Sequence, residues 1–600
     1  MSPRRAARRG ALGLALLMLA GLAACSPLVA GSEARVAVAA PFTSYNAETS
    51  HGRSSTTNSD VASLTGTGFG YTAPDGGLVL DESFGTAEIV QREPLIVRYT
   101  VAAGLRWSDG APLDAVDLLL AWAAGSGALN TPGFDDAPYV DGATGRYTDD
   151  FPAGAVWFDG RRAGGIEAAV STPQLVDGRT LLVRFERFVP SWRTVLAPGV
   201  PAHLLGALAA GADGPADPGA ARRAVAEAIL AGDAAALAPL SRAWNSALDL
   251  VAPAGAEGEV PASGPYRVAS VDEDGGVELV VNPRYTGRRA AVTETLRLVV
   301  SPDPLETAEL LADGVLDVAS PPPSENLVAA LHRIPGVAVT PGLSARVEHL
   351  DLRLSGGRSG ALADPRVREA FLLTVPREEI VERLIRPLSP DARVLDSFTV
   401  RESAAAYADA IAGNGSSRFA AVDLDRARAL LAQAGAGRPE LCILYDSGDP
   451  RRRAEFELIA ASAGRAGFRV DDCSRPDWES MLGVAGAYDA ALFSWDTSRL
   501  GPEAMGRVFH SASAVVNLNG FADPAADAIV EQLETEDDPG RQQELLAGLD
   551  AILWQAGYGL PLFTHPTVTA VRGGSVAGVS RSPLERGVLW NAWEWRPAQE

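Results

Sequence analysis

The stretch from Leu95 to Ala123 limits the fold of this chain more than any other part of its sequence. From Leu95 to Val101 alternate residues belong to two unlike faces, which is the two-residue period of a strand. The segment Ser108–Gly110 then favours a turn, because short polar side chains bond to nearby backbone and glycine tolerates positive φ. Asp114 is placed to cap a following helix. One side of that helix is apolar and consists of Val116, Leu119, Leu120 and Ala123. The pattern predicts a strand–turn–helix corner of an α/β protein.

Length and charge narrow the class of protein further. Six hundred residues exceed what one hydrophobic core normally organises, so two or more lobes are expected. The formal net charge of −23 argues against nucleic acid as a partner, because phosphates demand a basic face. All 52 basic residues are arginines. The sequence therefore offers no lysine for a P-loop, a Schiff base or an S-x-x-K serine hydrolase.

The amino-terminal segment predicts export. Four arginines, beginning with Arg4, precede the apolar run Ala11–Ala24, which is too short to span a bilayer as a mature helix. Leu22-Ala23-Ala24-Cys25 then resembles a bacterial lipobox. Residues 1–24 would be the signal peptide, Cys25 the lipidated first residue and residues 25–32 a tether; the alternative is a cysteine that stands there by coincidence. No other apolar run approaches the ~18 residues of a membrane span, so we expect an extracytoplasmic protein held on the cell membrane by lipid.

Several motifs, taken in chain order, resemble one known family. They are Leu105-Arg106-Trp107-Ser108-Asp109-Gly110 with Pro112, Ala115 and Asp117, then Ser263-Gly264-Pro265-Tyr266, Asn282-Pro283-Arg284-Tyr285 and Asp364-Pro365-Arg366-Val367. Together they resemble the family 5 extracellular solute-binding proteins, which are the oligopeptide- and dipeptide-binding receptors of ABC importers. The closing run from Trp590 to Trp595 is similar to actinobacterial members. Each motif is degenerate, and their order and spacing carry the resemblance.

The resemblance implies a fold and its boundaries. The expected fold is a two-lobed α/β fold of the periplasmic-binding-protein type (type II, large cluster), with an extra subdomain in the first lobe and a hinge between the lobes. The expected boundaries are 33–75, 179–294 and 511–600 for the first lobe, 76–178 for the extra subdomain and 295–510 for the second lobe. No cofactor is implied, and a monomer is expected.

The resemblance also implies a function. The lipid-anchored protein would capture peptides or similar small solutes in a cleft between the lobes and deliver them to an ABC permease with its ATPase subunits. The sequence leaves the ligand open between a peptide, an oligosaccharide, a metal chelate and an opine.

The segment Leu441–Asp496 predicts where a ligand would bind. A short apolar strand, a helix over Glu455–Ala466, a second strand, a helix near Trp478 and the strand Tyr488–Trp495 follow one another. This order predicts a parallel sheet with right-handed crossovers, whose ligands gather beyond the carboxyl ends of the strands.

Trp495 and Asp496 stand at such a strand end and are the leading candidates for the ligand site. In the family the matching Trp-x-x-Asp region lies in the cleft, where an acidic side chain can meet a peptide amino group. Here Asp496 follows Trp495 directly, and Ser498 stands two positions further along. The alternative is that Trp495 belongs to the core and Asp496 merely caps the next segment.

Other candidate residues come from the same resemblance. Tyr45 and Asn46 follow the predicted first strand and are ligand candidates, with loop packing as the alternative; Asn519, in Asn519-Gly520-Phe521, is another. Cys442 and Cys473 lie on neighbouring predicted strands, one early and one late. An exported protein can form this disulfide if the Cα atoms lie within about 7 Å, and two buried free thiols are the alternative.

An enzyme is the less favoured interpretation. The six histidines are scattered, without the spacing of a metal site, and there is no G-x-S-x-G elbow. We therefore expect no catalytic and no metal-binding residues. An exported hydrolase of peptides or glycosides, with a carboxylate pair, is the alternative. A solute sensor without an importer is another.

Overall fold

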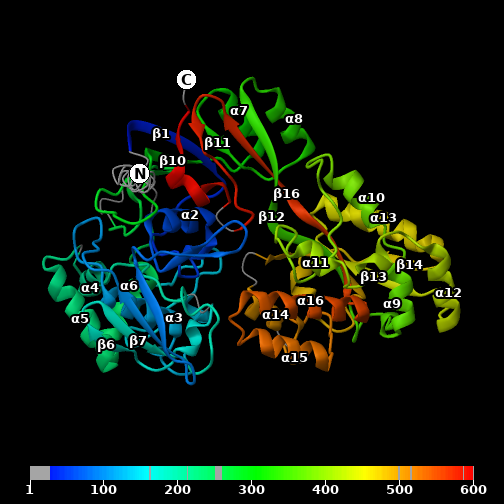
Figure 1. Cartoon of the computed structure of the whole chain (residues 1–600), viewed down its shortest axis with the longest axis horizontal. Coiled ribbons are helices and arrows are strands. Elements are labelled where there is room, and N and C mark those ends of the chain that lie inside the picture. Colours follow the sequence, from blue (N-terminus) through cyan, green and yellow to red (C-terminus); the bar gives the residue numbers. More distant parts are fainter. Residues whose placement is uncertain are drawn as a thin grey trace, which may run out of the picture.

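The computed structural model describes residues 28–160, 164–212, 214–250, 260–497, 501–513, 516–584 and 587–598. The predicted signal peptide, Cys25 and Ser498 lie outside these residues. Two lobes lie side by side, and the long strands β12 (Val337–Leu352) and β16 (Gly559–Arg572) run between them (Figure 1). The predicted two-lobed α/β fold is confirmed.

One sheet of the described chain extends through both lobes, in the order β14-β13-β15-β12-β16-β11-β1-β10-β9-β8. The strands on the first-lobe side are β1 (Val29–Val38), β8 (Tyr266–Val271), β9 (Val277–Val281), β10 (Thr293–Val300) and β11 (Val318–Ala319). Those on the second-lobe side are β13 (Glu440–Leu444), β14 (Arg469–Asp472) and β15 (Ala490–Asp496). β13 pairs in parallel with both β14 and β15, as the sequence predicts.

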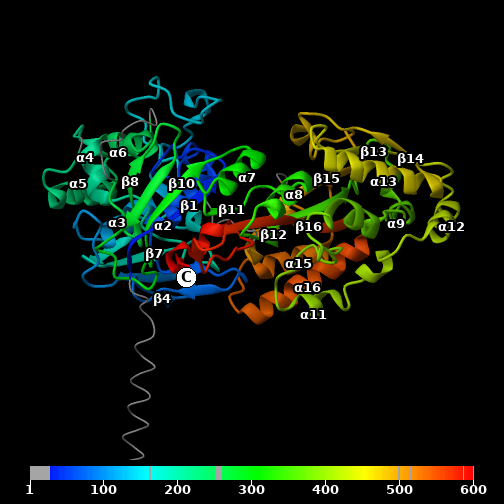
Figure 2. The same ribbon diagram turned by 90° about the horizontal axis from the view of Figure 1, so that it is seen from above.

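β12 and β16 connect the lobes as an antiparallel pair. Their register runs from Val337 opposite Arg572 to Asp351 opposite Gly559. The register shifts between Leu343 and Val347, near the middle of β12. In the first lobe β16 pairs with β11, and in the second lobe β12 pairs with β15. These two strands are therefore the crossing between the lobes (Figure 2).

The first lobe carries an antiparallel sheet in the order β4-β5-β7-β6, which is the extra subdomain. Its strands are β4 (Gly85–Gln91), β5 (Ile96–Val101), β6 (Gln174–Asp177) and β7 (Thr180–Arg184). Four helices share its core: α3 (Ala115–Ser126), α4 (Ala202–Ala209), α5 (Pro218–Ala231) and α6 (Ala234–Ser246). The first lobe also contains α2 (Thr56–Thr65), α7 (Pro304–Ala312), α8 (Glu325–Arg333), β2 (Gly70–Thr72), β3 (Leu78–Leu80), β17 (Val576–Ala577) and β18 (Arg596–Pro597).

The motif around Trp107 is a structural junction of this subdomain. Asp114 caps α3 as predicted, and Asp117 returns a bond to the Asp114 N–H at 2.9 Å. The buried Asp117 carboxylate also accepts the Trp107 indole N–H at 3.4 Å and the Ala202 N–H of α4 at 3.0 Å. Burial raises the pKa of Asp117 to about 6. The family motif thus joins the strand–turn–helix corner to α4 and acts as scaffold.

Helices cover both faces of the sheet in the second lobe. On one face lie α9 (Pro365–Leu372), α12 (Leu424–Ala434) and α13 (Pro450–Ala466). On the other lie α14 (Pro502–Phe509), α15 (Pro524–Leu533) and α16 (Pro539–Ala556). The short helices α10 (Arg377–Ile380) and α11 (Tyr407–Ile411) complete this lobe. Among the described residues no single helix could cross a membrane; the bent pair α5–α6 meets the length and composition test only when taken together.

The pairing corrects several expected boundaries. β10 pairs with β1, so the chain is still in the first lobe at residue 295 and leaves it only along β12. α15 and α16 pack in the second lobe, so the return to the first lobe is β16 and does not begin at 511. The subdomain core extends beyond residue 178, to α6. β1 begins at Val29, inside the expected tether. Sequence patterns show which residues form a strand. Packing decides which distant strand becomes its partner, and the expected boundaries were wrong for that reason.

Candidate functional site

The outer edge of β15 is the feature that could bind an extended ligand. β13 pairs with β15 only at Ala490 and Ala491, so in the described chain the edge from Leu492 to Asp496 has no strand partner. The Asp489 N–H points to β13, where it bonds the Cys442 carbonyl at 2.9 Å. The Asp489 carbonyl, however, accepts the Arg353 N–H at 2.8 Å, so the odd-numbered residues of β15 bond to β12. Because backbone groups alternate along a strand, the even-numbered residues, such as Ser494, present their N–H and C=O groups to this open edge.

The carboxyl end of β15 is directed toward the first lobe. β15 runs antiparallel to β12, and its last residue, Asp496, is opposite Arg346. Val337, at the start of β12, belongs to the first-lobe end of the crossing strands. The predicted parallel-sheet end is therefore an inter-lobe location, and Trp495 and Asp496 lie on it.

Aromatic rings stand around this edge. The Trp495 ring is half-buried, stacks on His349 at 5.8 Å between centroids, and meets Phe493 edge-on at 5.4 Å. The Trp478 ring lies 6.4 Å from that of Phe493, with the Arg452 guanidinium 5.1 Å from the Trp478 centroid. Trp495 therefore packs against the core and also keeps exposed surface. It combines features of both alternatives from the sequence, a core residue and a wall of the ligand site.

Asp496 lies where the lobes come near each other. Its side chain is exposed. Burial lowers the pKa of the Arg401 guanidinium, and the negative charge of Asp496 offsets part of that lowering. Arg401 donates to the Thr497 carbonyl at 2.7 Å. A Cβ on Gly76, in the β2–β3 loop of the first lobe, would be 2.9 Å from the Arg401 Nη1. This carboxylate is thus placed beside a second-lobe arginine that the first lobe approaches.

A buried ionic network supports the same end of the sheet. The fully buried Glu348 of β12 accepts from Arg452 at 2.8 Å, from Arg451 at 3.3 Å and pairs with His565 of β16 at 2.8 Å. Burial alone would raise the pKa of the Glu348 carboxyl, but Arg451, His565 and Arg452 outweigh it and hold this pKa well below its usual range. The network ties the start of α13 to both crossing strands.

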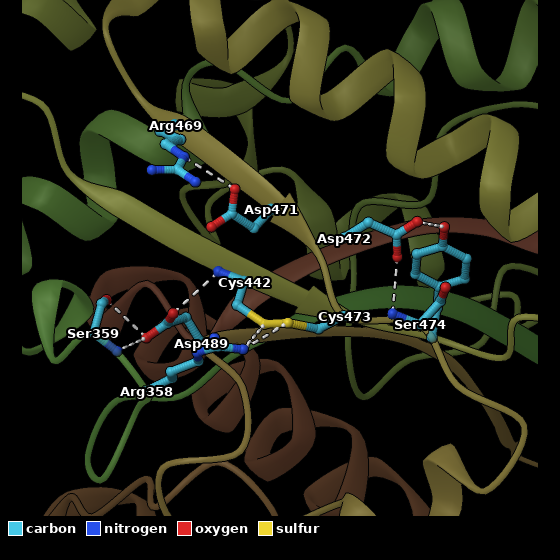
Figure 3. Close-up of a disulfide and its surroundings, with 10 residues drawn as sticks. Arg358, Ser359, Cys442, Arg469, Asp471, Asp472, Cys473, Ser474 and Asp489 are labelled. Atoms are coloured by element: carbon cyan, nitrogen blue, oxygen red, sulfur yellow. Dashed lines mark hydrogen bonds and ion pairs between the residues drawn. A yellow bond between two sulfur atoms is a disulfide. The ribbon is translucent and has the colours of Figure 1, made fainter.

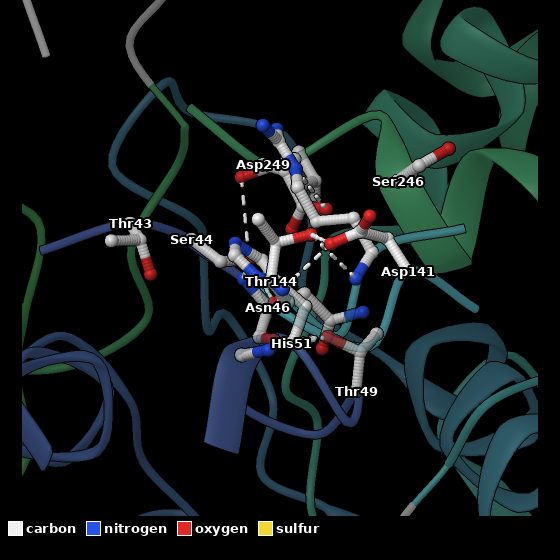
Figure 4. A network of polar contacts seen from close by, with 12 residues as sticks. Thr43, Ser44, Asn46, Thr49, His51, Asp141, Thr144, Ser246 and Asp249 are labelled. Carbon is white, nitrogen blue, oxygen red and sulfur yellow. Dashed lines mark hydrogen bonds and ion pairs between the residues drawn. The ribbon is translucent and has the colours of Figure 1, made fainter. Parts of the chain in front are cut away.

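Two candidates from the sequence belong to the scaffold. Asn46 is buried, its amide donates to the Trp244 carbonyl at 2.9 Å, and its Oδ1 accepts the Glu48 N–H at 3.2 Å. Figure 4 shows Asn46 within a polar network of the first lobe. Tyr45 is half-buried and packs edge-on against Phe42 at 4.9 Å. These contacts favour loop packing, the alternative interpretation of Tyr45 and Asn46, and their role as ligand residues stays a prediction.

Asn519 is buried at a chain connection and not on the open edge. Its Oδ1 accepts the Phe521 N–H at 3.0 Å, and its carbonyl accepts the Leu354 N–H at 2.9 Å. Its Nδ2 has no partner among the described residues. The geometry explains Asn519 as a junction between β12 and the chain before α15.

Cys442 and Cys473 form a disulfide, with Cα atoms 5.7 Å apart (Figure 3). Cys442 is opposite Asp471 in the β13–β14 pair, and Cys473 follows the end of β14. The early and late positions expected from the sequence are correct, and the bond is diagonal. Of the two alternatives, the structure contains the disulfide.

Some residues of the site were missed by sequence reasoning. Arg401 and Arg452 come from loops and helices distant in sequence, and no motif marks them. Trp478 could have been found, since it follows the carboxyl end of a predicted parallel strand. No group of three or more His, Cys, Asp or Glu side chains that could hold a metal ion occurs in the part of the chain described here.

Two lobes joined by two crossing strands are the architecture of two-lobed solute-binding proteins. The chain belongs to the bacterial extracellular solute-binding proteins, family 5, whose middle region matches residues 90–515. The family resemblance predicted from the motifs is confirmed, and this family binds solutes rather than transforming them.

Relatives and solved structures agree with this assignment. Uncharacterized lipoprotein Rv2585c of Mycobacterium tuberculosis (strain ATCC 25618 / H37Rv) is 30% identical over 621 residues, covering 100% of each chain. Oligopeptide-binding protein OppA of Mycobacterium bovis is 23% identical over 514 residues, covering 83% of this chain and 74% of that one.

The fold itself is that of solved binding proteins. The periplasmic EDTA-binding protein EppA has a TM-score of 0.72 at 19% identity, covering 96% of this chain and 98% of that one. The oligopeptide-binding protein AppA from Bacillus subtilis, in complex with a nonapeptide, has a TM-score of 0.59 at 15% identity, covering 95% and 99%.

Proposed function

We propose that this protein binds peptides in extended form along the open edge of β15 and delivers them to an ABC permease. The observation that carries the proposal is the run from Leu492 to Asp496, where backbone groups face the inter-lobe space without a strand partner in the described chain. An extended peptide adds to such an edge through main-chain hydrogen bonds, which any peptide sequence can make.

The surroundings support a peptide with a free amino group. Asp496 would accept a charge-assisted hydrogen bond from that group, and Trp478 and Trp495 would form walls for side chains. Water can fill the polar positions that a given side chain leaves empty, which allows broad specificity. The names of OppA and of the nonapeptide complex of AppA favour the same ligand class.

The test begins with native mass spectrometry of the mature protein, to identify ligand carried through purification. Calorimetry with the identified ligand then compares Asp496→Asn and Trp495→Ala with wild type. Loss of a charge-assisted bond of about 1.5–3 kcal/mol weakens binding about tenfold or more. Asp425→Asn is the matched control, because Asp425 is 95% exposed on α12 and far along the chain from β15. Unchanged affinity in both site variants contradicts the proposal, and hydrolysis of the peptide would favour the exported hydrolase.

Lipid anchoring through Cys25 is part of the proposal. It rests on Leu22-Ala23-Ala24-Cys25 and on relatives that are named lipoproteins. Metabolic labelling with a palmitate analogue should mark wild type and not Cys25→Ala. Equal label in both proteins would contradict an anchor at this cysteine.

A further inference from the structure

The disulfide lies beside an open pocket in the second lobe. This pocket of about 390 Å³ is lined by Cys473, Arg358, Ser474, Arg475, Asp477 and Met481, among others. Cys473 is half-buried, whereas Cys442 is only 3% exposed and does not line the pocket. A small reagent that enters the pocket can therefore reach the sulfur of Cys473 first.

A guanidinium group is aimed at both sulfur atoms. Nη1 of Arg358 lies 3.1 Å from the Cys473 Sγ and 3.4 Å from the Cys442 Sγ (Figure 3). In the described chain no carboxylate lies within 4.0 Å of Arg358 to neutralise it. Its positive charge is thus available to the sulfurs.

The backbone holds Arg358 in this position. Its N–H bonds the Tyr488 carbonyl at 3.1 Å. The next residue, Ser359, donates its N–H and its hydroxyl to the buried Asp489, each at 2.8 Å. Asp489 also accepts the Cys442 N–H at 3.0 Å, so three donors surround its charge. The loop of Arg358 and the strand of Cys442 are fixed to the same carboxylate.

A cation beside a disulfide favours its reduction, because the leaving sulfur departs as a thiolate and a neighbouring guanidinium stabilises that thiolate. We propose that the Cys442–Cys473 disulfide is a reducible link, which an extracytoplasmic dithiol opens through the pocket with Arg358 stabilising the thiolates that leave. Structural disulfides of secreted proteins typically resist reduction by the glutathione pool, whereas exposed disulfides are more easily reduced.

The exchange balances in two steps. One thiolate of the dithiol attacks the Cys473 Sγ, the S–S bond breaks, and Cys442 leaves as a thiolate beside Arg358. The second thiolate of the reagent then attacks its own sulfur in the mixed disulfide and releases Cys473 as a thiolate. The dithiol ends as a disulfide, its two electrons reduce the protein, and two protons bring the cysteines to thiols.

Reduction would loosen the segment from Cys473 to Ala487. The disulfide is part of a small apolar cluster in which Trp478, Met481 and Leu482 of this segment pack on β13 and β15. Besides the disulfide, the bonds from Arg475 N to the Tyr445 carbonyl (3.1 Å) and from Gly486 N to the Gly356 carbonyl (2.8 Å) hold it. Because Trp478 stands at the open edge of β15, reduction would also weaken ligand capture; this consequence rests on the proposed function.

The chemical test measures reduction of the native mature protein by dithiothreitol, with free thiols counted by iodoacetamide mass shift. The rate should rise in proportion to the dithiol concentration. Reduction of Arg358→Gln should be slower than that of wild type, because the leaving thiolate no longer has a cation beside it. Arg366→Gln is the control, because Arg366 is an exposed second-lobe arginine that pairs with Asp364 and not with sulfur. A rate independent of dithiol, or equal rates in Arg358→Gln and wild type, would overturn the proposal.

Hydrogen exchange distinguishes loosening of the segment from loss of ligand binding. Peptides from residues 474–487 should exchange faster after reduction, while those from α3 in the first lobe stay unchanged. This readout needs no ligand, so it holds or fails independently of the proposed function. Unchanged exchange in 474–487 would overturn the predicted loosening.

Discussion

An ion pair between the lobes offers the sharpest test of how this molecule closes. Arg92, in the β4–β5 loop of the first lobe, makes two bonds with Asp537, before α16 in the second lobe, at 3.1 and 3.2 Å. Among the described residues this ion pair joins the two lobes. In Figure 2 the end of the β4–β5 hairpin lies toward α15 and α16 of the second lobe. The Arg92 guanidinium also lies 4.4 Å from the centre of the Phe188 ring, which holds it in place.

The size of the effect follows from exposure. The two side chains are 53% and 27% exposed, so the pair counts as a surface pair and contributes about 0.2–1 kcal/mol. If the pair exists only in the closed arrangement, its loss lowers the ratio of closed to open molecules about 1.4- to 5-fold. Arg92→Asp should open the protein further than Arg92→Gln, because two carboxylates would then face each other.

Single-molecule energy transfer between dyes at Glu227 on α5 and Arg428 on α12 measures this ratio without a ligand. At low salt, Arg92→Asp and Asp537→Arg should each shift the distribution to longer distances, and the double variant should restore the wild-type distribution. At high salt, screening should bring wild type close to Arg92→Gln. Identical distributions for wild type and both single variants at low salt would refute the role of this pair.

Three further predictions concern stability and are measured by urea unfolding. Glu348→Gln should cost about 3–5 kcal/mol at neutral pH, because the buried Arg452 loses its closest anion and the partly buried Arg451 loses one of its partners. Since the folded pKa of Glu348 lies below its usual 4.5, the difference should shrink as pH falls below about 4.5, and a pH-independent difference would contradict the network. Asp117→Ala leaves the N–H groups of Asp114 and Ala202 unpaired and should cost about 1–3 kcal/mol of stability for each buried group. Asp117→Asn should lose less, because its amide oxygen can still accept a hydrogen bond. Equal losses in the two variants would contradict this account. Gly264→Ala should destabilise the folded protein, because its Cβ would meet the backbone of Thr65 and Gly66 at 2.6–2.7 Å. In the control Gly178→Ala the Cβ meets nothing within 4 Å, so stability should not change. Equal stability of the two variants would refute the steric argument.

Much of the local structure followed from the sequence alone. The strand before Trp107, the cap at Asp114 and the parallel order from Leu441 to Asp496 all rest on interactions between residues close in the chain. Periodicity, caps and turns depend on those short distances, so they could be read directly. The position of Trp495 and Asp496 at a strand end is of the same kind.

The tertiary structure decided what those elements face. The crossing at β12 and β16, the packing of α15 and α16 in the second lobe, and the approach of Gly76 to Arg401 join residues that are far apart in sequence, and no local pattern specifies them. The bond from the Asn46 amide to the Trp244 carbonyl could not be predicted for the same reason. Local backbone preferences determine an element, but only packing of distant segments determines which polar groups are already bonded and which edge stays open for a ligand.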